Sequence, residues 1–212
     1  IVVSGTERYS EDDVIRATGI EAGDNLFLLN KYEAARNIAD ALPYIDIEDI
    51  WIRRDLPDTL LIDVKECGTV LAAVRNGSAW LVSPRGKIVE QLPAAQAGDY
   101  GRISGCELLA PSVGTDIAMP TEMAARQESL LALMAALDEA GLMDRVEDID
   151  LEEASQITMA YMGRFRVEMT YGADYPRMLR ILEGAVSQLE TNQTGTITLD
   201  PGSQYEAIFT PD

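Results

Sequence analysis

The sequence has no histidine among its 212 residues. Histidine is the commonest general base and a frequent zinc ligand, so its absence argues against Ser and Cys catalytic triads and most zinc sites. Cysteine is scarce as well, because only Cys67 and Cys106 are present and they form no CxxC motif. The sequence leaves open whether these two residues form one disulfide or remain two thiols.

Positive charge and long apolar runs are also scarce. The formal net charge of −19 argues against nucleic-acid binding and against docking on anionic lipid through basic residues. No apolar run reaches the roughly 18 residues that a membrane-spanning helix needs, and no signal peptide is evident. An apolar content of 47% with 25% charged residues is typical of a globular domain.

Motifs that carry chemistry are missing. The acidic stretch from Glu147 to Glu153 has no glycine and overlaps an apolar alternation, so a solvated strand edge is a better interpretation than a calcium site. Carboxylate pairs for glycoside hydrolysis arise by chance among 36 acidic residues, and no glycine-rich loop matches a phosphate-binding motif. We therefore predict no catalytic residue, no metal site and no cofactor.

Residues 1–66 predict a β-α-α-β-β unit. Ser10 and Asn30 are placed to cap two helices, and Gly19 ends the first of them. The stretch Leu42–Glu66 alternates apolar and polar residues on both sides of a turn at Asp55–Asp58 that contains Pro57, which predicts a hairpin.

Residues 69–212 predict a larger mixed domain with an antiparallel sheet and two packed helices. Asn76–Gly77 is a strong hairpin signal, and residues 93–120 are expected to be loop with one short strand near Cys106–Leu109. The helices are expected over residues 121–140 and 174–189. The predicted fold class is α+β, with domains at 1–68 and 69–212.

The final predicted strand, Tyr205–Phe209, is the most promising binding surface. We expect it to lie at a sheet edge, and exposed edges accept partner strands. The alternative is that Tyr205, Ala207 and Phe209 pack into the core, and both can hold because one face can be buried while the backbone edge stays open.

The chain resembles the extracytoplasmic region of the bacterial division family FtsQ, called DivIB in Gram-positive bacteria. Its first unit is similar to that family's POTRA domain in Ile1–Gly5, in Gly23–Phe27 and above all in Arg54–Glu66, where an Arg-x-x-Pro-x-Thr-Leu turn precedes a strand that ends in Glu. The rest resembles the family's β domain, more loosely, in Ala79–Gly86 and Gly195–Asp200.

The resemblance implies a non-catalytic scaffold in a single-pass membrane protein, with a transmembrane helix just before Ile1 and this region on the extracytoplasmic side at the septum. It implies binding of FtsB/DivIC-type and FtsL-type proteins, which helps to recruit and regulate septal peptidoglycan synthesis. The family's partner strand adds at the last strands of the β domain. Carried over here, the partner-binding residues are Tyr205, Glu206, Ala207, Ile208 and Phe209, flanked by Tyr175, Arg177 and Met178.

Two other functions stay open at this point. One is a POTRA-bearing chaperone of protein export or outer-membrane assembly, although residues 67–212 resemble neither further POTRA units nor a barrel. The other is an acidic-site hydrolase or a calcium-binding cell-wall protein that uses the carboxylates near Glu147–Glu153.

Overall fold

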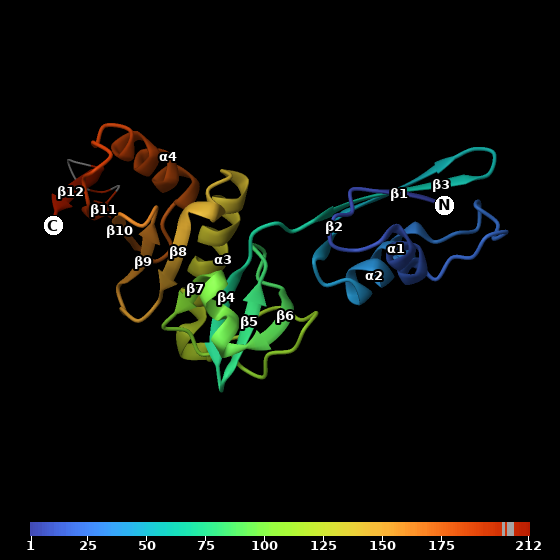
Figure 1. The fold of residues 1–212 in the computed structure, drawn as a ribbon, viewed down its shortest axis with the longest axis horizontal. Coiled ribbons are helices and arrows are strands. Elements are labelled where there is room, and N and C mark those ends of the chain that lie inside the picture. The colour runs from blue at the N-terminus through green and yellow to red at the C-terminus, as the bar shows by residue number, and fades with distance from the viewer. Residues whose placement is uncertain (201, 203–205) are drawn as a thin grey trace. The chain divides into compact units, whose positions relative to one another are not determined.

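The computed structural model describes residues 1–200, 202 and 206–212 of the chain (Figure 1). The chain divides into two compact units, Ile1–Gly68 and Thr69–Asp212. Each has its own sheet and its own apolar core. The predicted α+β class is confirmed.

The first unit has the predicted β-α-α-β-β order. Its elements are β1 (Val2–Ser4), α1 (Glu11–Thr18), α2 (Lys31–Ala41), β2 (Ile45–Asp55) and β3 (Thr59–Glu66). The sheet order is β1-β3-β2, with β1 parallel and β2 antiparallel to β3. Strand β2 is therefore an edge of this sheet.

Local sequence signals account for the ends of both helices. The Ser10 side chain accepts a hydrogen bond from the Asp13 N–H while the Asp13 carboxylate accepts from the Ser10 N–H, which is a reciprocal cap of α1. Gly19 ends α1 at a φ of 71°, a left-handed conformation that favours glycine. Asn30 caps α2 by accepting from the Glu33 N–H.

The β2–β3 hairpin forms where the alternation predicts it. Leu60, Ile62 and Val64 are buried in the core of the first unit. Alternation breaks near the start of β2, where the register shifts between Ile45 and Ile50. That irregularity leaves Ile47 38% exposed, although it belongs to the apolar pattern of the strand.

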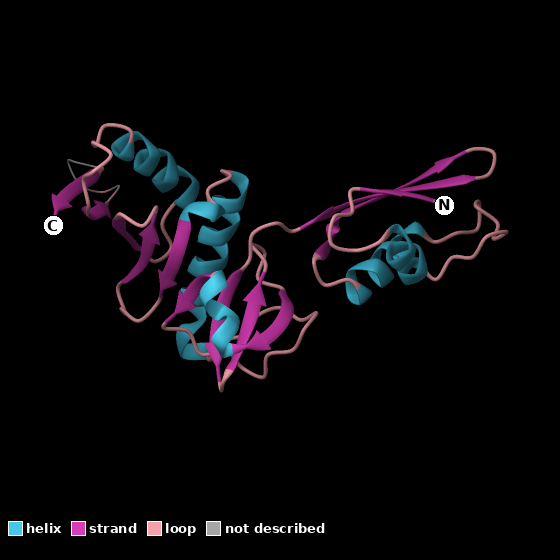
Figure 2. Ribbon diagram, in the orientation of Figure 1, coloured by secondary structure: helices cyan, strands magenta, loops and turns pink. Residues whose placement is uncertain are grey.

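The second unit is built on one nine-stranded sheet of order β12-β11-β10-β9-β8-β7-β4-β5-β6. Its strands are β4 (Leu71–Arg75), β5 (Ser78–Val82), β6 (Ile88–Pro93), β7 (Gly101–Ser104), β8 (Val146–Asp150), β9 (Gln156–Tyr161), β10 (Phe165–Thr170), β11 (Gly195–Leu199) and β12 (Ala207–Pro211). Its helices are α3 (Ala124–Glu139), α4 (Tyr175–Val186) and the short 3-10 turns η1 (Ala94–Asp99), η2 (Thr121–Met123) and η3 (Met143–Arg145). The two long helices are those predicted, and they pack together over the strands (Figure 2).

The expectation of an antiparallel sheet is wrong in part, because the sheet is mixed. Strand β7 pairs in parallel with both β4 and β8, and β10 pairs in parallel with β11. Parallel neighbours need a crossover, and α3 connects β7 to β8 as α4 connects β10 to β11. Both crossovers step toward β12 from strands of the same direction, so the usual right-handed connection puts both helices on one face.

The short strand expected near Cys106–Leu109 instead lies at Gly101–Ser104. Periodicity could not place it, because Ile103 is the one large apolar residue in this four-residue strand. Tertiary packing defines it, since a Cβ on Gly101 would lie 2.6 Å from the Val146 carbonyl oxygen and 2.8 Å from Leu71.

The final strand is also shifted, since β12 spans Ala207–Pro211 rather than Tyr205–Phe209. Tyr205 lies outside the described residues. Pro211 belongs to β12 because proline is tolerated where the backbone nitrogen faces away from the neighbouring strand. Within the described part of the chain, no helix is long and apolar enough to cross a membrane.

Candidate partner-binding edge of the second unit

Strand β12 is one of the two outer strands of the nine-stranded sheet, and β6 is the other. The chain itself covers the first half of β6. Ile88 donates to the Thr115 carbonyl and accepts from the Gly114 N–H, both at 2.8 Å, and Ile117 donates to the Gly86 carbonyl at 2.8 Å. The covering residues, 114–117, belong to the segment 93–120 that the sequence predicts to be mostly loop. Along β12, no strand among the described residues pairs with the outer side.

Two backbone hydrogen bonds at the ends of β12 show which of its backbone groups face outward. The Asp212 N–H donates to the Thr194 carbonyl, and the Asp200 N–H donates to the Glu206 carbonyl, both at 3.2 Å. In an antiparallel pair, the backbone N–H and C=O groups of successive residues point alternately toward and away from the neighbouring strand. The even-numbered residues from 206 to 212 therefore bond to β11, and the backbone groups of Ala207, Phe209 and Pro211 face outward. Pro211 fits this assignment, because it has no N–H to lose from the ladder.

The side chains of β12 divide between two environments. Ile208 is 47% exposed, on the face that also carries Thr198. Phe209 lies on the helix-covered face, half-buried, and meets the Phe165 ring edge-on at a centroid distance of 6.2 Å. The Arg164 guanidinium carbon lies over the Phe165 ring, 4.6 Å from the ring centroid. The Phe209 side chain thus packs inward while its backbone faces the open edge.

Gly195 allows β12 to approach its neighbour. It pairs with Pro211 and has a φ of 152°, a conformation that side chains rarely adopt. A Cβ there would overlap the Thr210 carbonyl oxygen and come within 2.9 Å of the Pro211 Cα and 3.0 Å of the Phe209 ring. Any other residue at this position would push β12 away from the sheet.

Helix α4 flanks the edge, but two of its three predicted contact residues are buried. Tyr175 is 1% exposed and Met178 is fully buried, so both belong to the core of the second unit. Arg177 remains accessible and pairs with the Glu206 carboxylate just before β12. Of these predicted flanking residues, only Arg177 offers a side chain to solvent beside the strand.

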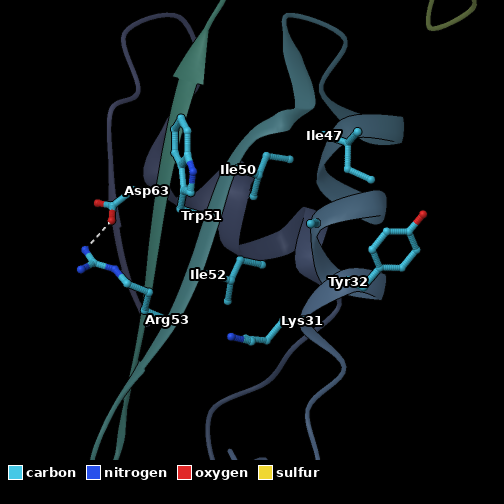
Figure 3. Close-up of a pocket in the computed structure, with 9 residues that line it drawn as sticks. Lys31, Tyr32, Ile47, Ile50, Trp51, Ile52, Arg53 and Asp63 are labelled. Carbon is cyan, nitrogen blue, oxygen red and sulfur yellow. Dashed lines mark hydrogen bonds and ion pairs between the residues drawn. The ribbon is translucent and has the colours of Figure 1, made fainter.

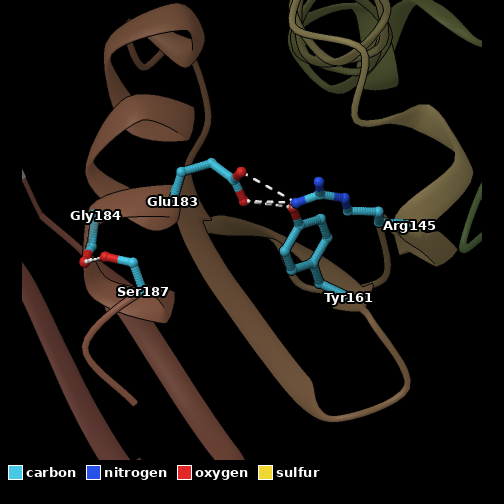
Figure 4. Close-up of polar contacts among 5 residues, drawn as sticks. All are labelled: Arg145, Tyr161, Glu183, Gly184 and Ser187. Carbon is cyan, nitrogen blue, oxygen red and sulfur yellow. Dashed lines mark hydrogen bonds and ion pairs between the residues drawn. The ribbon is translucent and has the colours of Figure 1, made fainter. Parts of the chain in front are cut away.

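A polar cluster that the sequence did not reveal fixes the position of α4 (Figure 4). The Tyr161 hydroxyl donates to Glu183 Oε1 at 2.7 Å, and Arg145 Nη1 donates to Tyr161 Oη at 3.3 Å and to Glu183 Oε2 at 3.0 Å. Burial first, and then the bond to Glu183, raises the pKa of Tyr161 to about 12. The phenol therefore stays protonated at neutral pH and keeps its donor directed at α4.

The first unit has a second open edge, at β2, which the sequence did not reveal (Figure 3). A hollow of about 790 Å³ runs between β2 and α2, with Ile50 and Ile52 in its lining. Tyr32 on α2 is 71% exposed and Trp51 on β2 is 50% exposed. Arg53 and Asp63 form an ion pair at 2.7 Å on the side of the β2–β3 strands that faces away from α2 (Figure 3). The sequence signal was present as aromatic residues at polar positions of the helix and strand patterns.

The described residues offer no grouping of three or more His, Cys, Asp or Glu side chains that could hold a metal ion. The structure contains no disulfide between Cys67 and Cys106. Burial raises the pKa of the Cys106 thiol to about 11, so at neutral pH it is a packing residue and a poor nucleophile. These observations lend no support to a calcium site or a cysteine-based chemistry.

Comparison with known proteins shows which protein domains and proteins this chain is similar to. Residues 1–66 match the family model of the FtsQ-type POTRA domain, which is the whole of the β-α-α-β-β unit. The chain is 24% identical over 150 residues to a cell division protein FtsQ of Corynebacterium glutamicum, covering 70% of this chain and 66% of that protein. It is 22% identical over 200 residues to a cell division protein DivIB of Clostridium acetobutylicum, covering 93% of this chain and 76% of that protein.

Residues 1–66 thus match an FtsQ-type POTRA domain, and most of the chain is similar to cell-division proteins named FtsQ and DivIB. The resemblance seen in the sequence is confirmed. Both relatives carry names of cell-division proteins, which supports a role in cell division.

Proposed function

We propose that this chain is the extracytoplasmic part of a non-catalytic division scaffold whose β12 edge accepts a strand from an FtsB/DivIC-type protein. FtsL-type proteins join the complex, which helps to recruit and regulate septal peptidoglycan synthesis. The protein is held in the cell membrane by one transmembrane helix ahead of Ile1 and acts at the septum. The observation that carries this proposal is the open outer side of β12.

The contrast between the two sheet edges supports the proposal. Proteins usually blunt exposed strand edges because such edges recruit other chains. Here the chain covers the start of β6 with residues 114–117 and leaves β12 uncovered in the described structure. An uncovered edge exposes a protein to unwanted pairing with other chains. The open outer side of β12 is therefore consistent with a strand that binds a partner.

The chemistry of β12 defines what a partner must bring. The N–H groups of Ala207 and Phe209 and the carbonyls of Ala207, Phe209 and Pro211 face outward. An extended peptide can satisfy them, and an apolar side chain at the right register can cover the exposed Ile208. Arg177 and Glu206 beside the strand supply one charge of each sign.

The alternative functions have less support. The family match is to an FtsQ-type POTRA domain over residues 1–66, and the second unit is a single sheet with helices. That arrangement does not favour an export chaperone, which would be expected to carry further POTRA units or a barrel. Without histidine, and without a metal-binding group in the described residues, a hydrolase has no assigned site.

Substitution of Ile208 by aspartate is expected to weaken binding of a purified FtsB/DivIC-type ectodomain at least about tenfold, because the charge would lie against an apolar side chain of the added strand on the same face of the sheet and be partly desolvated there. Titration calorimetry gives the affinity, and Phe209→Asp should act in the same direction while also loosening β12. Val74→Asp is the matched control, because Val74 on β4 is 49% exposed and Ile208 is 47% exposed. Unchanged affinity of Ile208→Asp with an intact fold would rule out this edge as the binding site.

A further inference from the structure

Two large apolar side chains project from the loop between α1 and α2 in the first unit. Phe27 is 71% exposed and Leu28 is 81% exposed, whereas their neighbours Leu26 and Leu29 pack against the core. Leu56, at the turn between β2 and β3, is 59% exposed. Soluble domains place scattered apolar residues at the surface, but two adjacent and highly exposed ones at a loop tip suggest a contact.

The loop holds this tip in a defined shape. Arg54 on β2 donates from Nε to the Leu26 carbonyl at 2.6 Å and from Nη2 to the Leu29 carbonyl at 2.8 Å, so one guanidinium fixes both sides of the tip. Asn25 accepts from the Phe27 N–H at its side chain and from the Leu28 N–H at its carbonyl, both at 3.0 Å. The outward direction of Phe27 and Leu28 is therefore built into the fold.

The tip lies at the end of the first unit where the chain begins. The α1–α2 loop, the β2–β3 turn and the N-terminus share that end (Figure 1). Ile1, Phe27 and Pro57 line one hollow there of about 420 Å³, so the three segments are close together.

We propose that Phe27 and Leu28 insert into the interfacial layer of the lipid bilayer and so set the orientation of the first unit on the membrane. This rests on the membrane anchoring proposed above, because a helix that enters at Ile1 would hold this end within reach of the lipid. The two side chains are apolar and highly exposed, which suits insertion into a soft interface, and phenylalanine and leucine are typical of interfacial apolar faces.

The charges around the tip indicate which lipid headgroups it can contact. Glu21, Asp24 and Asp58 line the hollow beside the tip, and Arg54 is engaged with the loop carbonyls. An acidic surrounding does not attract anionic headgroups, so the contact depends on apolar insertion. Zwitterionic lipid is therefore the favoured surface, and added anionic lipid should weaken the contact at low salt.

Fluorine NMR tests the insertion, because the chain has only three phenylalanines. The 212-residue chain, labelled with fluorophenylalanine, is tethered by an N-terminal polyhistidine tag to phosphatidylcholine nanodiscs that contain a chelator lipid and a paramagnetic headgroup lipid. We expect the relaxation rate of the Phe27 signal to rise at least about fivefold more than that of Phe165, which is 3% exposed.

Tethering alone brings the chain near the lipid, so two variants separate proximity from insertion. Leu28→Asp, tethered in the same way, should lose most of the Phe27 enhancement, and Arg54→Gln should reduce it by releasing the loop. Leu109→Asp, at a 44% exposed site in the second unit, should change nothing.

Three results would overturn the proposal. The first is equal enhancement in the wild type and Leu28→Asp. The second is a Phe27 change that depends on protein concentration without lipid, which would indicate a second copy. The third is a change that requires the partner ectodomain, which would indicate protein docking. Partner affinity of the same samples, measured by calorimetry, tests the β12 proposal independently.

Discussion

Substitution of Gly195 by alanine is expected to abolish partner binding, with at least about a hundredfold loss of affinity, while the first unit keeps its stability. A Cβ at this position would overlap the Thr210 carbonyl oxygen and crowd Pro211 and Phe209, and the φ of 152° is itself unfavourable for alanine. Strand β12 must move away from β11 to relieve the clash, and the ladder that presents its outer side is then lost. Calorimetry with an FtsB/DivIC-type ectodomain measures the effect.

Gly184→Ala is the control for this experiment. Gly184 lies in α4, and a Cβ there would meet nothing within 4 Å. Alanine should leave binding unchanged and stabilise the helix by up to about 1 kcal/mol. If Gly195→Ala binds as tightly as the wild type, a docked β12 is not needed for partner recognition.

A pair of proline substitutions in β12 is expected to distinguish backbone groups that face a partner from backbone groups that bond to β11. Ala207 faces outward, so Ala207→Pro removes a donor that only a partner strand would use, and its cost to stability should stay within about 1 kcal/mol. Binding should fall by about tenfold or more, because the incoming strand loses one hydrogen bond and meets the ring. Pro211, in the same outward phase, shows that this strand accepts proline.

Ile208→Pro is the matched variant with the opposite phase. Ile208 is in step with the bonds to β11, so proline there breaks the native ladder and should lower the melting temperature as well as binding. Chemical denaturation reports stability, and calorimetry reports affinity. Equal binding by Ala207→Pro and the wild type would show that the partner does not use the β12 backbone.

The elements that the sequence predicted well are those with local causes. Ser10, Gly19 and Asn30 each act within a few residues of themselves, and all three cap their helices as expected. Alternation around Pro57 likewise places the β2–β3 hairpin, because one face of those strands must be buried.

The elements that it misplaced depend on distant neighbours. Strand β7 has little periodicity of its own and exists because β4 and β8 pair with both of its sides. The parallel pairs β7–β8 and β10–β11 follow from helical crossovers, and the parallel pair β4–β7 follows from the return of the chain after β6, which no local pattern encodes. The start of β12 is set by pairing with β11, and Pro211 joins the strand because its nitrogen faces outward.

The candidate site shows the same division. The sequence could place the last strand at an edge, since that required only the order of the elements. Its helical spacing does place Met178 on the apolar face of α4 with Leu179 and Leu182, and all three are buried. The sequence could not show that Arg145, Tyr161 and Glu183 meet, because these side chains come from separate segments.

Amide hydrogen exchange at β12, followed by NMR, tests directly whether a partner strand adds to this edge. On addition of the partner ectodomain, the N–H groups of Ala207 and Phe209 should become protected, whereas Ile208 and Thr210 are already bonded to β11 and should change little. This alternation is the signature of an added strand. Unchanged exchange at Ala207 and Phe209 in the saturated complex, or protection confined to the β2 edge of the first unit, would contradict the account.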